Sequence, residues 1–518
     1  MKVFSTARVG RVAALSALIL AACTPTKDPS KSKAEEDAPK TAETPTPEPI
    51  QSPRSAAATT FAPKDGAPEW LGLLIADHVT RRLLVQPAEG QTQPPLYVFG
   101  YRQAMSAARS IGVAPEEVAA RADDVIRELG ADALVVGSYT VSGPQATIEW
   151  QIAGTKSPPQ TLEVSLFDAS KAAYGIGESV LKALANGYVS ESPLPLAADA
   201  AEAWGTALAG LARQSRDPRA SVVLRKADRT SVLAALDTVT KTEATFAPAW
   251  ATRAAVASMG SETEEQVAMN ATKAALNSSS ADPSAAISLY YSQQHLAEQS
   301  EARQTLVEAL KTYPGSLEVM NYLAQAYYLA GDFEECLTVW DDYLKRVPKS
   351  LHASRRRGKT LAKLDRRDEA VAAAKKLAEA NPESLPTMAA LASRQIDAGQ
   401  MEIAKATLTE QLQKHPDHPL LLTRLSYIEL ESGSADRALA LARKAVEQLG
   451  DGRGERLAGY AHIDLARALA LTGKRGEARE SLKKSLRLGV SGDDVFRLAT
   501  DPRLQGFIKL PIVLNPED

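Results

Sequence analysis

Small and apolar positions recur with a period of 34 residues in the C-terminal half of the chain. The small residues on this period are Ala302, Cys336, Ala370, Ala404 and Ala438, and the prolines are Pro314, Pro348, Pro382 and Pro416. A fixed period of this length is typical of a solenoid of stacked helix pairs. We expect the small residues to mark where two helices of a pair touch, and each proline to end the second helix.

One unit carries the full pattern. Leu317–Ser350 reads LEVMNYLAQAYYLAGDFEECLTVWDDYLKRVPKS, with Leu323, Ala324, Tyr327, Gly331, Phe333, Cys336, Trp340 and Pro348 in signature positions. The array resembles the tetratricopeptide repeat family over residues 283–489. Residues 197–282, with Trp204 and the run Phe246–Trp250, resemble degenerate units, and residues 490–518 are predicted to form a C-terminal cap. The resemblance implies an α-solenoid that binds proteins or peptides.

The periodicity changes in residues 68–190, where helical and strand-like segments alternate. The predicted helices are Trp70–Leu83, Pro115–Leu129 and Asp168–Leu184, and the predicted strands are Leu96–Gly100, Ala133–Val141, Ala146–Ala153 and Thr161–Phe167. This order predicts a small α/β domain with one sheet under helices. The fold class is therefore mostly α, a solenoid preceded by a small α/β domain.

The run ELGADALVVGSYTVSG, Glu128–Gly143, is followed by paired strand segments. It resembles the N-terminal domain of TolB-like envelope proteins. The resemblance implies a role in partner binding or assembly in the cell envelope, and it brings no catalytic residues.

The first residues predict the compartment. Lys2, Arg8 and Arg11 precede the short apolar run Val12–Leu20, a pattern typical of a secretory signal. The following LAAC, which ends at Cys23, resembles the lipobox of bacterial lipoproteins. This resemblance implies a signal peptide over residues 1–22 and a lipid on the Cys23 thiol. The alternative is an ordinary signal with an unrelated cysteine.

The lipobox resemblance implies the bacterial cell envelope, and by the sorting rule of that family Thr24, a residue other than Asp after the cysteine, implies the outer membrane, facing the periplasm. Residues 23–67 are rich in Pro, Thr, Ala, Ser, Lys and Glu. Such a segment buries too little apolar surface to fold. We therefore expect a disordered, lipidated N-terminal tether.

The composition limits which ligands the protein is expected to bind. The net charge is −3, with six histidines and two cysteines, so no basic surface for nucleic acid is indicated. Cys336 lies on the small-residue period and is interpreted as a packing residue. Neither a cofactor nor a metal is expected.

Three short motifs suggest chemistry, but their context argues against it. The run Ala353–Thr360 (ASRRRGKT) satisfies a loose phosphate-loop pattern, yet no strand precedes it, so no nucleotide site is predicted. His415–His418 (HPDH) falls in a link between repeats, and a solvated turn is preferred to a metal site. Gly175–Gly177 (GIG) lacks the third glycine of a dinucleotide site and is interpreted as a weak point in a helix.

The sequence also predicts a peptide-binding groove. In the resembled family, side chains of the first helix of each unit line the concave face. Here these positions hold Asn321, Gln325, Arg355, Arg356, Lys359, Arg394 and Arg424. Cations and amides on one surface suit a carboxylate or an acidic extended peptide. The alternative is a solvated basic face balanced by Asp365 and Asp368, and Arg357 stands where the family usually has Leu.

Three functions are compatible with these features. The first is a lipid-anchored periplasmic scaffold or adaptor that binds envelope proteins. The second is a sensory or regulatory subunit of an envelope signalling system, which the sequence does not separate from the first. The third, an enzyme with a site in the α/β domain, is disfavoured because His78 is the only histidine there.

Overall fold

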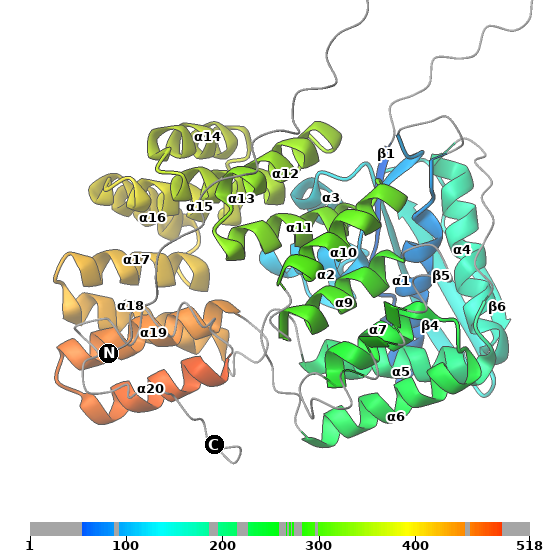
Figure 1. Cartoon of the computed structure of the whole chain (residues 1–518). Helices are drawn as coiled ribbons and strands as arrows, with labels where there is room; N and C mark the ends of the chain where they lie inside the picture. Colours follow the sequence, from blue (N-terminus) through cyan, green and yellow to red (C-terminus); the bar gives the residue numbers. More distant parts are fainter. Residues whose placement is uncertain are drawn as a thin grey trace, which may run out of the picture. The chain divides into compact units, whose positions relative to one another are not determined.

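The computed structural model describes residues 54–87, 93–185, 195–214, 226–257, 282–295, 299–450 and 456–488, with a few residues of 266–273. The chain is mostly helical, with a small α/β domain followed by paired helices (Figure 1). The signal peptide, the lipid on Cys23, most of the tether and the C-terminal cap lie outside the described residues. No helix in the described part is long and apolar enough to cross a membrane.

The sheet of the α/β domain has the order β3-β1-β4-β5-β6. Its strands are β1 (Arg54–Ala58), β3 (Leu96–Phe99), β4 (Ala133–Ser142), β5 (Gln145–Ala153) and β6 (Gln160–Ser165), and β2 (Ala62–Pro63) pairs with β4. Strand β1 runs parallel to β3 and β4, whereas β4, β5 and β6 form an antiparallel meander.

The predicted tether is wrong at its C-terminal end. Arg54–Ala58 forms the strand that lies between β3 and β4, and Ala56, Ala57 and Ala58 have no exposed surface. A strand of alanines has no large apolar side chain from which it could be predicted. Its methyl groups are nevertheless buried on both faces of the sheet, so Arg54–Ala58 belongs to the α/β domain.

The helices of the α/β domain cover opposite faces of the sheet. Helix α1 (Glu69–Leu83) leads from β1 towards β3, and α2 (Tyr101–Ser110) and α3 (Ala122–Leu129) lead from β3 to β4. Because right-handed crossovers in opposite directions place their helices on opposite faces, α1 shares a face with α4 (Ala169–Leu184), and α2 and α3 cover the other.

Two predictions here need correction. Helix α2 has no counterpart in the predicted elements. The predicted helix Pro115–Leu129 is a short 3-10 turn, Pro115–Glu117, followed by α3, which begins at Ala122.

The remaining helices form the repeat array. Their bounds are α5 (Ala198–Gln214), α6 (Lys226–Thr242), α7 (Ala247–Ala257), α9 (Pro283–His295), α10 (Gln299–Thr312), α11 (Leu317–Ala330), α12 (Phe333–Arg346), α13 (Leu351–Lys363), α14 (Arg367–Ala380), α15 (Leu385–Asp397), α16 (Met401–Lys414), α17 (Pro419–Glu431), α18 (Ala435–Leu449), α19 (Arg456–Leu471) and α20 (Arg475–Arg487). From α9 to α20 each helix contacts the next.

The period in the sequence determines these helix ends. Helices α10, α12, α14 and α16 each stop two residues before the proline of their unit. Ser316 caps α11, since its Oγ accepts the Val319 N–H at 3.3 Å, and Gly331 ends that helix with a positive φ of 87°. The small residues of the period are at most 1 % exposed, so they form the contacts between helices.

Each face of the sheet is closed by a different part of the chain. On one face α1 and α4 form a core that continues into α5 and α6, with Trp204 buried in it. On the other face α2 and α3 share a core with α11 and α12, to which the repeat array contributes Cys336, Trp340 and Tyr343. The α/β domain and the repeats therefore have common cores.

Close packing at the small-residue period can be tested by overpacking it. Ala370→Leu and Ala404→Leu should each lower the free energy of unfolding by about 1–3 kcal/mol, because both sites are buried between helices. Ala372→Leu, at an exposed position of the same helix as Ala370, should cost little. Urea titrations of the three variants decide, and equal effects would show that the register is wrong.

Candidate functional site

The predicted groove residues lie on the first helices of four consecutive units. Asn321 and Gln325 are on α11, Arg355, Arg356 and Lys359 on α13, Arg394 on α15 and Arg424 on α17. Helix α13 contacts α15, and α15 contacts α17. The structure thus brings these residues onto adjacent helices, but it gives them different partners.

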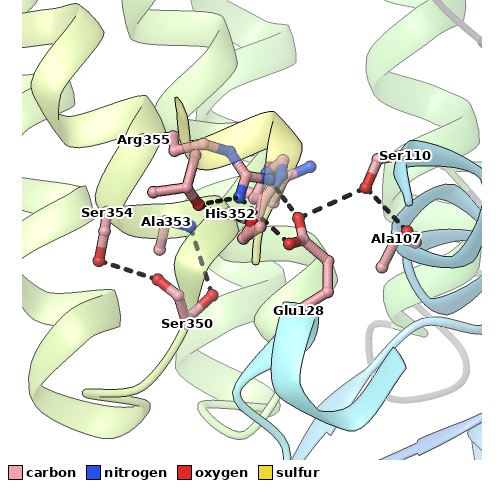
Figure 2. Close-up of polar contacts among 11 residues, drawn as sticks. Ala107, Ser110, Glu128, Ser350, His352, Ala353, Ser354 and Arg355 are labelled. Carbon is pink, nitrogen blue, oxygen red and sulfur yellow. Dashed lines mark hydrogen bonds and ion pairs between the residues drawn. The ribbon is translucent and has the colours of Figure 1, made fainter. Parts of the chain in front are cut away.

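Arg355 is held by the α/β domain. Its guanidinium donates from Nη1 to Oε2 of Glu128 at 3.2 Å and from Nη2 to Oε1, and Nη1 also lies 3.4 Å from Thr387 Oγ1. Figure 2 shows the Glu128 carboxylate, from α3, between Arg355 and Ser110. The side chain of Arg355 is 15 % exposed and that of Glu128 2 %. This pair is therefore a largely buried, bidentate ion pair between α3 and α13.

The backbones of the two parts also fit closely. Gly130 ends α3 with a φ of 77°, and a Cβ at that residue would overlap the backbone between Lys349 and Ser350. Val98, in β3, donates its N–H to the carbonyl of Gly315 at 2.8 Å. The turn before α11 therefore covers the outer edge of β3, and the loop before α13 covers the end of α3.

A second carboxylate fills the position where open α/β sheets usually bind ligands. That position lies at the carboxyl ends of neighbouring strands whose following helices cover opposite faces. Here the chain leaves β1 for α1 and leaves β3 for α2, so the position is at Gly100. The carboxylate of Glu318, from α11, lies so close to Gly100 that a Cβ there would overlap it. Burial raises the pKa of Glu318 to about 7, although the charge of Arg102 opposes this shift.

Two arginines of the predicted groove retain unpaired donors. Arg394 donates from Nη2 to Asp397 at 2.9 Å, but its Nε and Nη1 are buried without a partner among the described residues, and so is Nε of Arg424. Burial lowers the pKa of Arg394, as does the charge of Arg424 nearby. The adjoining cavity between α13, α14 and α15 is about 10 Å³, enough for about one water molecule.

Asn321 and Lys359 contact neighbouring side chains, whereas Gln325 keeps an unpaired oxygen. Asn321 Oδ1 lies 3.1 Å from His352 Nε2, and the Lys359 ammonium lies 4.7 Å from the centroid of the Tyr328 ring. Burial raises the pKa of the Cys336 thiol, and the charges of Arg356 and Lys359 oppose this shift. Gln325 is half-buried, and its Oε1 has no partner among the described residues.

Arg357, at the position usually held by Leu, joins three helices by charge. Its Nε donates to Asp341 on α12 at 2.5 Å, and its Nη2 lies 3.8 Å from Glu369 on α14. An ion pair between helices therefore stands where the family packs an apolar side chain.

The three short motifs are in the contexts that the sequence predicts for them. Ala353–Thr360 lies inside α13, and Gly175–Gly177 lies inside α4. His415–His418 connects α16 to α17, and Asp417 pairs with Lys444 at 2.6 Å. No group of side chains able to hold a metal occurs in the described part of the chain.

One constellation has no signal in the sequence. His78 places Nε2 3.0 Å from Ser170 Oγ and Nδ1 3.4 Å from Asp77 Oδ2. These are the residue types of a hydrolase triad. All three are at most 3 % exposed, however, and Asp77 also accepts the indole N–H of Trp204 at 2.9 Å. Burial also lowers the pKa of His78. The group therefore ties α1 to α4 and α5, with no access for a substrate.

Comparisons with known proteins confirm the repeats. A tetratricopeptide repeat family model matches residues 330–384 and 389–453, so the chain contains tetratricopeptide repeats. The comparisons match neither lipoproteins nor the TolB-like domain. No protein of curated function matches the sequence significantly.

Solved structures of repeat proteins are similar over parts of the chain. A tetratricopeptide repeat protein from Parabacteroides merdae is 18 % identical, with 46 % of this chain and 91 % of that chain covered and a TM-score of 0.36. YrrB, a repeat protein described with an unusual peptide-binding site, is 15 % identical, with 36 % and 96 % covered and a TM-score of 0.24. The human IFIT1 dimer with m7Gppp-AAAA is 16 % identical, with 62 % and 78 % covered and a TM-score of 0.32.

The ion pair between α3 and α13 gives a double-mutant prediction. Glu128→Ala and Arg355→Ala should each cost about 3–5 kcal/mol of unfolding free energy, because each leaves a buried charge unpaired. The double variant should cost clearly less than the sum of the two. The same cycle at Lys375 and Glu379, an exposed pair on α14, should give a coupling of about 0–1 kcal/mol. Additive losses at the buried pair would mean that α3 is not docked on α13.

Proposed function

We propose that this protein is a lipid-anchored scaffold or adaptor of the bacterial cell envelope that binds other envelope proteins through its repeats. Tetratricopeptide repeats generally mediate protein–protein interactions, which supports this class of function and argues against an enzyme. The proposal includes no cofactor, no nucleotide and no nucleic acid. The membrane is reached through the lipid on Cys23, and the signal pattern with Thr24 supports an outer-membrane site facing the periplasm.

The observation that supports a binding surface is the pair of partly unsatisfied guanidinium groups on α15 and α17. A buried donor without a partner costs about 1–3 kcal/mol, and Arg394 and Arg424 together leave three such nitrogens. Because these nitrogens are buried in the structure, a partner's carboxylate would pair with them as the two side chains turn outward. Since Arg355 is already paired with Glu128, the surface for a partner is centred on Arg394 and Arg424 rather than on the whole predicted groove.

The chemistry of these donors indicates the partner. Planar guanidinium groups match carboxylates with two parallel hydrogen bonds. We therefore infer an acidic extended segment or a C-terminal carboxylate of another envelope protein. Its affinity should weaken as salt rises, because part of the attraction is electrostatic.

Charge removal tests the surface. The full chain is titrated with a labelled peptide of alternating Glu and Ser with a free C-terminus, and with an amidated Gln–Ser peptide as the uncharged control. Arg394→Gln with Arg424→Gln should weaken binding of the acidic peptide at least about tenfold, since each lost charged hydrogen bond is worth about 1.5–3 kcal/mol.

The matched control is Lys375→Gln with Lys414→Gln, which removes the same charge from exposed side chains on the second helices α14 and α16. It should leave binding unchanged. Equal weakening by both double variants would assign binding to overall charge. Circular dichroism of each variant checks that the helices remain.

The anchor has its own test. Mass spectrometry of the N-terminal peptide should find a lipid on Cys23, and Cys23→Ser should release the protein from the membrane fraction. A wild-type N-terminus at another bond, without lipid, would remove the anchor from the proposal and leave the binding surface untouched.

A further inference from the structure

Among the described residues, one edge of the sheet is covered and the other is open. Strand β3 is covered by the turn at Gly315 and Ser316. Strand β6, at the other end of the sheet, pairs in the described part of the chain only with β5, and its residues Gln160 to Glu163 are exposed. An open edge presents unpaired N–H and C=O groups to another strand.

The side chains at this edge are apolar or uncharged, with one exception. Glu163 is the only charged residue of β6. Leu162 is 36 % exposed and Phe167, in the 3-10 turn after the strand, is 72 % exposed. The edge carries no lysine, which natural proteins commonly use to block strand addition. Pro158 and Pro159 limit pairing only at the start of the strand, since they have no N–H to donate.

We propose that this edge binds a second copy of the chain, with the two β6 strands antiparallel about a two-fold axis at Leu162. Residues on opposite strands then face each other when their numbers sum to 324. Leu162 faces its own copy, Thr161 faces Glu163, and Gln160 faces Val164. The apolar face is continued, because Leu162 and Val164 pair within the chain with the buried Ile148 and Ala146.

The register with the two-fold axis at Leu162 is favoured over the registers with the axis one residue away. Residues that stand opposite each other must point to the same face of the sheet. The two-fold axis must therefore pass through a residue and not between two residues. An axis at Glu163 would set two carboxylates opposite each other, which is destabilising. An axis at Thr161 would set Leu162 opposite Gln160 and Pro159 opposite Glu163 within the ladder, whereas the axis at Leu162 sets Pro159 opposite Ser165, the last residue of the strand. The Leu162 register instead sets Pro158 of the second copy opposite Leu166, next to the exposed Phe167.

Disulfide trapping tests both the pairing and its register. All variants are made in the full chain with Cys23→Ser, and Cys336 is buried. Leu162→Cys should form a covalent dimer on oxidation, because directly opposite residues have the spacing of a disulfide. Thr161→Cys and Glu163→Cys should each stay monomeric alone but cross-link when mixed. Ala372→Cys, exposed on α14, measures random collision.

A second experiment needs no cysteine. Sedimentation of the Cys23→Ser chain should show a concentration-dependent dimer, and Leu162→Lys should abolish it by placing like charges opposite each other. Leu329→Lys, at an exposed leucine of α11, should leave the dimer intact. A monomer at all concentrations, or cross-linking of Leu162→Cys no faster than Ala372→Cys, would overturn the proposal. A dimer insensitive to Leu162→Lys would overturn it as well.

Discussion

The structure depends on the need to cover both faces of a sheet whose inner strands run parallel. Strand β1 is flanked by parallel neighbours, and its alanines are buried on both faces. Such a sheet is stable only with a layer of helices on each side. Helices α1 and α4 cover one face. On the other, α2 and α3 are short, and the layer is completed by α11 and α12 of the repeats.

This constraint changes how the repeats can be used. Helix α13 gives Arg355 to Glu128, and α11 places Glu318 against Gly100. The α/β domain thereby occupies part of the surface that a repeat array usually offers to peptides. The unsatisfied arginines lie further along, on α15 and α17. The division explains why a chain with groove cations on the three first helices α13, α15 and α17 leaves only the later two for a partner.

The sequence predicted the local structure well where a period or an alternation existed. The small-residue period from Ala302 to Ala438 and the prolines predicted the helix pairs, and the alternating runs predicted β4, β5 and β6. Strand β1 escaped detection because RSAAA has no alternation and follows a segment of disordered composition. The contacts that define the site could not be predicted from the sequence. Glu128 and Arg355 are 227 residues apart, and the residues around either one do not indicate the other. The same holds for the contact between His78 and Ser170, which are 92 residues apart.

The central claim is that the sheet and the repeats α11 to α13 form one cooperative unit, and hydrogen exchange at increasing urea tests it most directly. Amides of β1 and β4 and amides of α11 to α13 should lose protection together, with the same free energy and the same dependence on urea. The account would be contradicted if α11 to α13 exchanged at lower urea while β1 and β4 stayed protected, because the sheet would then hold its second face without them.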